Sequence, residues 1–142
     1  MDLSSTELHR EILLDHSKSP QNKGQPAEFD LTAEHRDRET GDEVVIWLSL
    51  SGDALVEIHW EAKGSGVLNA SCSLMSEHLK GQGIMSALSS IESFLGMLTN
   101  SDDIEDWEQF GDTAALSGIR HLPARVQCAA LPWRVTQTLL QG

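Results

Sequence analysis

The spacing of apolar residues changes once along this chain, from every second position to a helical period, and this change constrains the fold more than any other feature. Two alternating segments flank a turn at 51–53: Val44, Ile46, Leu48 and Leu50, then Val56, Ile58 and Trp60. Alternation around a Ser-Gly-Asp turn predicts an antiparallel hairpin. We expect a further strand near residues 29–35.

After Gly64 the apolar residues recur at helical spacing. We expect helices at 64–81, 84–98 and 124–140, and an N-terminal helix capped by a residue in the run Ser4-Ser5-Thr6 and ending near residue 17. The acidic segment 102–112 is expected to form a loop or a short helix. Pro132 falls inside the last predicted helix, so this helix either starts nearer Leu131 or kinks there.

Strands followed by helices predict an α+β fold, a two-layer sandwich in which a three-stranded, mainly antiparallel sheet is packed by helices. The length of 142 residues predicts a single domain covering 1–142. The sequence contains two cysteines, so we expect no framework of disulfide bonds. We find no export signal at the N-terminus and no apolar run near the roughly 20 residues that span a bilayer, so we expect a cytoplasmic protein without membrane contact.

The charge of the chain excludes one class of partner. Ten basic residues stand against 22 acidic ones, for a formal net charge of −12. Such a chain repels phosphate backbones, so we expect no nucleic-acid binding.

Hydrolase and transferase functions are disfavoured by the motifs, because the sequence contains no Gly-x-Ser-x-Gly elbow, phosphate-binding glycine loop or histidine metalloprotease motif.

Four motifs occur in a distinctive order: Asp15-His16-Ser17-Lys18-Ser19-Pro20-Gln21-Asn22, Thr40-Gly41-Asp42, Gly64 to Gly81, and Pro123-Ala124-Arg125-Val126-Gln127-Cys128-Ala129. Together they resemble the U-type iron–sulfur cluster assembly proteins, closest to the SufU branch of the IscU/NifU family. The resemblance covers nearly the whole chain. The long stretch between Gly81 and Cys128 is similar to SufU-type rather than IscU-type members.

The resemblance implies a site of three cysteines and one aspartate, which binds zinc or serves cluster assembly. The corresponding positions here are Thr40, Asp42, Ser65 and Cys128. In the family, the first cysteine is implied to accept persulfide sulfur from a cysteine desulfurase. A hydroxyl neither ionises near neutrality nor carries a persulfide, and it is a poor ligand for zinc. We therefore expect Asp42 and Cys128 to remain as residual metal ligands, with weak binding of zinc or an iron–sulfur cluster, or none.

Other residues have competing interpretations. Arg125 could lower the pKa of Cys128 and pair with Asp42, or form an ordinary surface ion pair. Cys72 is expected to be a core thiol rather than a ligand. His35 is the least implausible substitute ligand among the histidines.

The roles of five further residues are interpreted from their neighbours in the sequence. His59, His78 and His121 are expected to be solvated, and Asp15 and His16 either cap or pack the first helix or take part in docking.

Three functions follow from the resemblance. The first is an iron–sulfur cluster assembly protein that is not an enzyme and acts mainly by binding a cysteine desulfurase or another Suf-type assembly partner. The second is a regulatory or decoy paralogue that has lost metal binding and sulfur transfer. In the third, Cys128 accepts sulfur and Cys72 resolves it.

Overall fold

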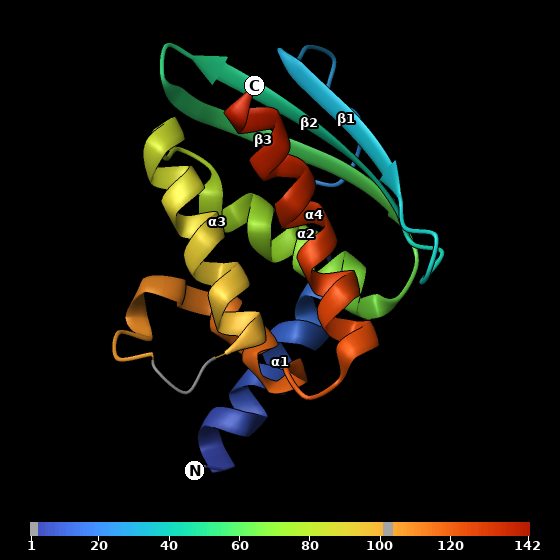
Figure 1. The fold of residues 1–142 in the computed structure, drawn as a ribbon, viewed down its shortest axis with the longest axis vertical. Coiled ribbons are helices and arrows are strands. Elements are labelled where there is room, and N and C mark those ends of the chain that lie inside the picture. The colour runs from blue at the N-terminus through green and yellow to red at the C-terminus, as the bar shows by residue number, and fades with distance from the viewer. Residues whose placement is uncertain (1–2, 101–103) are drawn as a thin grey trace.

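A three-stranded antiparallel sheet packs against a layer of helices (Figure 1). The computed structural model describes residues 3–100 and 104–142. The elements follow in the order α1 (Leu3–Lys18), β1 (Leu31–Arg36), β2 (Glu43–Ser51), β3 (Ala54–Lys63), α2 (Gly66–Leu79), α3 (Ile84–Thr99), the 3₁₀ helix η1 (Glu108–Ile119) and α4 (Pro123–Gln141). The α+β class, the hairpin and the third strand are confirmed.

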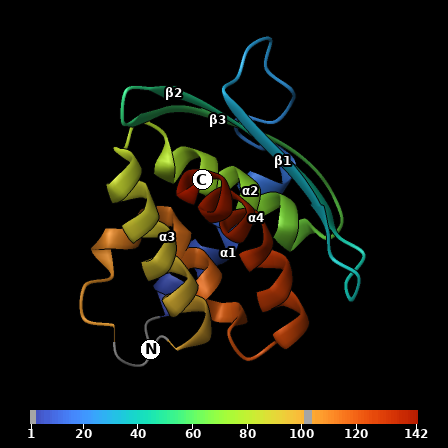
Figure 2. The same cartoon turned by 45° about the horizontal axis from the view of Figure 1, so that its top comes forward.

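Strand β2 lies at the centre of the sheet and buries one face. Ile46 pairs with Ala33 of β1 and with Trp60 of β3. Val44, Ile46 and Leu48 are fully buried, because their side chains point to the face that the helices cover. Figures 1 and 2 show the helices on one side of the sheet. The period-two pattern in the sequence is therefore the buried face of a half-covered sheet.

Helices α2 and α4 are joined by a buried polar contact at the centre of the core. Ser71 Oγ donates a hydrogen bond to the carbonyl oxygen of Ala129 at 2.6 Å and accepts one from Trp133 Nε1 at 2.9 Å. Phe94 of α3 stacks on Trp133 with ring centroids 3.7 Å apart. These contacts fix how α4 lies on α2, and both helices carry residues of the candidate site.

One expectation about a helix end was wrong. Helix α1 begins at Leu3, so the run 4–6 lies inside the helix rather than capping it. The helix expected at 124–140 is confirmed as α4, which starts at Pro123, so the alternative of a later start near Leu131 does not hold. Proline suits the first turn, where a backbone N–H has no helical partner. Pro132 stays inside the helix, where its ring is buried in the core.

The acidic segment is only partly described, since 101–103 lie outside the described residues. Its remainder leads into η1, which bends at Gly111, where φ is +52°. Within the described residues, no helix combines the length and apolarity that crossing a membrane requires.

Candidate functional site

Two loops and the start of α4 enclose a hollow of about 790 Å³. The β1–β2 loop contributes residues 39–42, the β3–α2 connection and the start of α2 contribute residues 64–67, and α4 contributes Ala124, Arg125 and Cys128. All four positions implied by the family resemblance, Thr40, Asp42, Ser65 and Cys128, therefore line one hollow. We call it the Cys128 hollow.

Asp37 holds the β1–β2 loop in place. Its Oδ1 accepts hydrogen bonds from the backbone N–H of Glu39 at 2.8 Å and of Thr40 at 3.2 Å. Its Oδ2 accepts a bond from Gln127 Nε2 at 2.9 Å. The hydrogen bond to the Glu39 N–H is the main cause that lowers the pKa of the Asp37 carboxyl. Asp37 thus ties the loop to the residue next to Cys128.

The sequence analysis did not predict these hydrogen bonds of Asp37. The available signal was an aspartate at the start of a short polar loop, a position at which the carboxylate commonly accepts bonds from the following backbone N–H groups. The link from Asp37 to Gln127 joins residues 90 apart in the sequence. No local sequence pattern predicts a hydrogen bond between residues so far apart in the chain.

The two hydroxyls in the Cys128 hollow are engaged with the backbone. Thr40 Oγ1 accepts a hydrogen bond from the N–H of Asp42 at 3.2 Å. Ser65 is the N-cap of α2, and its Oγ accepts a bond from the N–H of Leu68 at 3.2 Å. Serine is a favoured N-cap because its oxygen satisfies an N–H left free in the first helical turn. Both side chains therefore shape the walls of the hollow.

Asp42 is a buried acidic residue in the lining of the Cys128 hollow. It is 3 % exposed, and its Oδ2 is the one buried side-chain oxygen or nitrogen without a hydrogen-bond partner among the described residues. Gly64 lies against the other oxygen, since a Cβ at Gly64 would collide with Asp42 Oδ1 and come within 2.8 Å of Leu68 Cδ2. Gly64 is thus required by the position of the carboxylate as well as by its own positive φ of +159°.

The Cys128 thiol lies among these groups and is buried. Burial is the main cause that raises its pKa; the neighbouring Asp42 carboxylate raises it further, and the Ser65 hydroxyl lowers it. A buried thiol beside a carboxylate favours the neutral form. The surroundings of Cys128 therefore disfavour its thiolate form.

Of the two interpretations that the sequence left open for Arg125, the one in which it pairs with Asp42 and lowers the pKa of Cys128 does not hold in the structure. Arg125 lines the Cys128 hollow, but its side chain is exposed, and no ion pair between Arg125 and Asp42 occurs in the described part of the chain. The pKa of Cys128 is raised rather than lowered. An exposed guanidinium keeps its hydration and is screened by water, so it does not offset burial of the thiol.

The remaining candidates lie elsewhere. Cys72 is fully buried in the hydrophobic core, as expected, and burial raises its pKa. His35 is exposed on β1 and does not line the Cys128 hollow. His59 bonds to Glu57 at 2.9 Å, and His121 is exposed. Burial lowers the pKa of His78, which was expected to be solvated.

Among the residues described, no three His, Cys, Asp or Glu side chains cluster in a way that could hold a metal ion.

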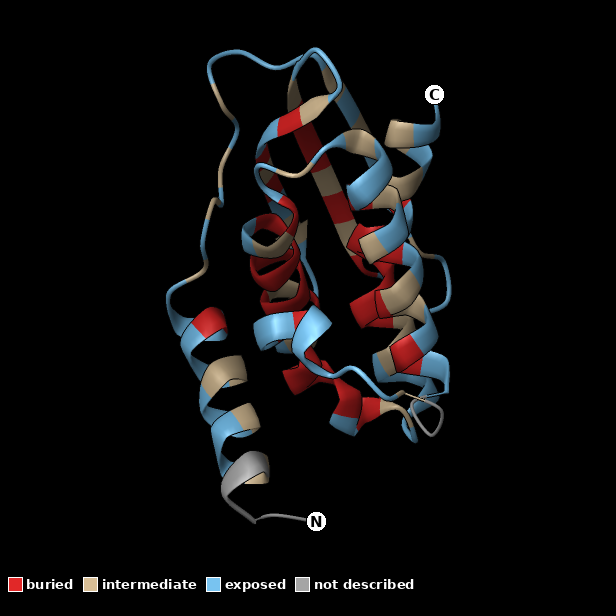
Figure 3. Cartoon of the chain, turned by 90° about the vertical axis from the view of Figure 1, so that its left-hand side faces the viewer, coloured by how far each residue is buried: buried red, intermediate tan, exposed pale blue. Residues whose placement is uncertain are grey.

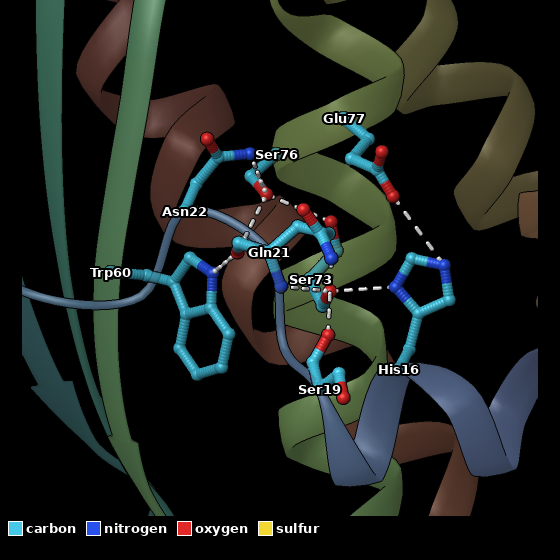
Figure 4. Close-up of polar contacts among 8 residues, drawn as sticks. All are labelled: His16, Ser19, Gln21, Asn22, Trp60, Ser73, Ser76 and Glu77. Atoms are coloured by element: carbon cyan, nitrogen blue, oxygen red, sulfur yellow. Dashed lines mark hydrogen bonds and ion pairs between the residues drawn. The ribbon is translucent and has the colours of Figure 1, made fainter.

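His16 takes part in packing. Its ring is buried, and its Nδ1 lies 2.6 Å from Ser73 Oγ (Figure 4). Ser73 Oγ also accepts a bond from the Gln21 N–H at 2.8 Å. His16 Nε2 lies 3.5 Å from Glu77 Oε1. The histidine therefore joins the end of α1 to α2.

The turn after α1 is fixed to the sheet by the same network. The Gln21 carbonyl accepts bonds from Trp60 Nε1 at 2.8 Å and from Ser76 Oγ at 3.3 Å, and Asn22 Nδ2 donates to Ser76 Oγ at 2.9 Å (Figure 4). The motif at 15–22 thus has a structural role in this chain.

Comparison with known proteins identifies the family. The model of the NifU-like N terminal domain matches residues 8–129. The chain belongs to this family. Within it, the chain is a SufU-type member of the IscU/NifU group, as the sequence motifs predicted. It is 32% identical over 130 residues to "Zinc-dependent sulfurtransferase SufU" of Bacillus subtilis, with 92% of this chain and 87% of the relative covered.

Other members of the family show weaker identity over a similar length. The chain is 25% identical to "Iron-sulfur cluster assembly scaffold protein IscU" of Thermotoga maritima, covering 94% of this chain and 93% of the relative. A putative scaffold protein for the SUF system from Fervidobacterium islandicum superposes with a TM-score of 0.83 at 25% identity, covering 92% of this chain and 94% of the other. The fold of this NifU-like domain is thus shared across the family.

Proposed function

We propose that this NifU-like domain is an iron–sulfur cluster assembly protein that acts in the cytoplasm mainly by binding a cysteine desulfurase or another assembly partner, and is not an enzyme by itself. Its similarity to proteins named as a zinc-dependent sulfurtransferase and as cluster scaffolds supports the pathway. The observation that carries the proposal is the Cys128 hollow, in which the four positions implied by the family resemblance lie together and Cys128 supplies the one thiol among the lining residues.

The residues in the hollow do not fit a tetrahedral zinc site. Zinc prefers thiolate, imidazole and carboxylate ligands. Here Asp42 supplies one carboxylate and Cys128 one thiol, while the oxygens of Thr40 and Ser65 already accept backbone hydrogen bonds. A structural zinc site supplies roughly 10–16 kcal/mol of apparent binding free energy, much of it from thiolates that are missing here. We therefore propose weak binding of zinc or a cluster, or none.

Sulfur transfer is restricted by the same chemistry. Thr40 cannot carry a persulfide, so Cys128 is the remaining acceptor in the hollow. Its raised pKa leaves little thiolate at neutral pH. Cys72 does not serve as a resolving thiol in this arrangement, because it lies fully buried in the core. Partner binding is therefore the better-supported role.

The decoy paralogue is a second candidate, favoured by the burial and raised pKa of Cys128. Such a chain would occupy the desulfurase without receiving sulfur. Mass spectrometry of the chain after incubation with desulfurase and cysteine separates the two functions. A persulfide on Cys128, absent from Cys128→Ser, indicates a carrier, and an unlabelled chain that still binds the desulfurase indicates a decoy.

Metal analysis tests the degenerate site. The chain is purified without chelator and compared with Cys128→Ser. We expect substoichiometric zinc in both proteins. Tightly held zinc at one ion per chain, lost in the variant, would contradict the proposal. A pull-down with the desulfurase of the same genome tests the pathway, and no binding would argue against it.

A further inference from the structure

A second groove adjoins the Cys128 hollow and is lined by α1, η1 and the start of α4. Its volume is about 920 Å³. We call it the α1–η1 groove. Arg125 lines both depressions, so the groove continues the surface of the Cys128 hollow. Helix α1, which forms one wall, has mainly exposed and intermediate residues until its last turns (Figure 3).

The charge of the groove is opposite to that of the chain. Three of the ten basic residues of the sequence, Arg10, Arg120 and Arg125, line it, together with His9. No carboxylate is found among the described residues that line it. This concentration is notable because the chain carries a net charge of −12.

These arginines have no anionic partner within the described ranges, where the ion pairs involve other residues. In the described structure, the one hydrogen bond donated by these guanidinium groups runs from Arg120 Nη1 to the carbonyl oxygen of Ser117 at 3.2 Å. Three like charges in one groove repel each other, and an incoming anion relieves that repulsion. The groove is therefore complementary to a ligand with several negative charges.

The lining of the groove also includes apolar side chains. Leu13, Trp107, Ala114 and Ile119 contribute to its lining. Trp107 is 39% exposed, whereas the other three tryptophans of the sequence are buried. Exposed tryptophan and arginine together are typical of the residues that dominate protein–protein interfaces. The ligand thus needs apolar side chains as well as carboxylates.

We propose that the α1–η1 groove binds an acidic amphipathic segment of a protein partner. Carboxylates of that segment pair with Arg10, Arg120 and Arg125, and its apolar side chains cover Trp107 and Leu13. Arg125 lies on the shared border, so a partner that reaches Cys128 also passes over the groove. The identity of this partner as an assembly protein rests on the proposed function.

A synthetic amphipathic helical peptide, with a leucine stripe flanked by glutamates, tests the chemistry. Its binding to the full chain is followed by tryptophan emission, to which Trp107 is the exposed contributor. The groove variant is Arg10→Glu/Arg120→Glu. The matched control is Arg36→Glu/Arg38→Glu, which makes the same charge change at exposed positions outside the groove. Circular dichroism establishes that both variants are folded.

We expect the acidic peptide to shift the emission to shorter wavelength. We also expect the groove variant to weaken binding by about tenfold or more, and the control by less than about threefold. Equal affinity of the two variants would overturn the proposal. So would equally tight binding of a lysine-substituted peptide, and binding of tripolyphosphate in place of the acidic peptide would assign the groove to phosphate ligands instead.

The cysteine desulfurase of the same genome then separates this inference from the proposed function. If the wild-type chain does not bind the desulfurase but binds the acidic peptide through its arginines, the proposed function fails and the groove stands. If the desulfurase binds the wild-type chain and the groove variant equally well, the function stands and the groove is not its docking surface.

Discussion

Restoring the two missing cysteines should convert the Cys128 hollow into a zinc site. The variant Thr40→Cys/Ser65→Cys would place three thiols and the Asp42 carboxylate around one hollow, because all four positions already line it. The buried Asp42 Oδ2, which has no hydrogen-bond partner in the described structure, is then available as a ligand atom. Three thiolates and a carboxylate form a complete four-coordinate donor set for zinc.

The two substitutions and the bound zinc are expected to change the free energy of unfolding in opposite directions. Without metal, loss of the Ser65 cap costs about 1 kcal/mol. Loss of the bond from the Asp42 N–H to Thr40 Oγ1 costs about 0.5–1 kcal/mol, because the hydroxyl is only half-buried. Zinc present at about 1,000 times its dissociation constant adds about 4 kcal/mol. The zinc-loaded variant should therefore be more stable than the wild-type chain by about 2 kcal/mol.

Thermal unfolding with and without EDTA measures this difference. At roughly 4 °C per kcal/mol for a domain of this size, zinc should raise the Tm of the double variant by about 15 °C. The Tm of the wild-type chain should not change. The triple variant that adds Cys128→Ser serves as control and should lose most of the zinc effect.

Two results would refute the reasoning. A folded double variant that binds no zinc would mean that the four positions do not converge as the Cys128 hollow suggests. A wild-type chain whose Tm falls by a similar amount in EDTA would mean that hydroxyls at 40 and 65 do not disable the site. Metal content measured on the same samples distinguishes zinc binding from a general effect of the chelator.

Three smaller perturbations test other parts of the structure. Gly64→Ala should destabilise the chain by about 1–3 kcal/mol in urea unfolding, because the added Cβ collides with the Asp42 carboxylate, and an unchanged midpoint would contradict the contact. Asp42→Asn removes a charge that raises the pKa of Cys128, so its alkylation by iodoacetamide should reach half-maximal rate at lower pH than in the wild-type chain; an identical pH profile would show that the carboxylate does not act on the thiol. Ser71→Ala leaves the buried Trp133 N–H without its acceptor and should cost about 1–3 kcal/mol, and a cost near zero would indicate that this bond contributes little.

Sequence reasoning predicted the fold well because its signals are local. Alternation over 44–60 indicates a half-buried hairpin, and the helical period beyond Gly64 indicates helices, of which α2 starts at the recognisable N-cap Ser65. Helix α1 was less predictable at its start, since three consecutive possible N-caps precede the apolar stripe and the helix extends past all of them. The range predicted for α4 was correct, and Pro132, which had suggested a later start as an alternative, is accommodated inside the helix because tertiary packing overrides the low helix propensity of proline.

The sequence indicated which residues line the candidate site, but it did not indicate the direction in which the pKa of Cys128 is shifted. Motif order indicated that Thr40, Asp42, Ser65 and Cys128 meet. The direction of the pKa shift depends on how deeply Cys128 is buried and on how near Asp42 and Arg125 lie. Neither quantity can be derived from the sequence. Whether any metal binds there stays a prediction.

The two hydroxyls explain how the Cys128 hollow keeps its shape with one thiol. A metal ion in such a site would hold the β1–β2 loop, the start of α2 and α4 together. In this chain Thr40 and Ser65 each accept a backbone bond within their own segment, and Asp37 bridges the loop to Gln127 of α4. Hydrogen bonds of this kind contribute about 0.5–1.5 kcal/mol each and need no metal. Thr40 and Ser65 therefore stabilise their own segments locally, so the shape of the Cys128 hollow does not depend on a bound metal ion.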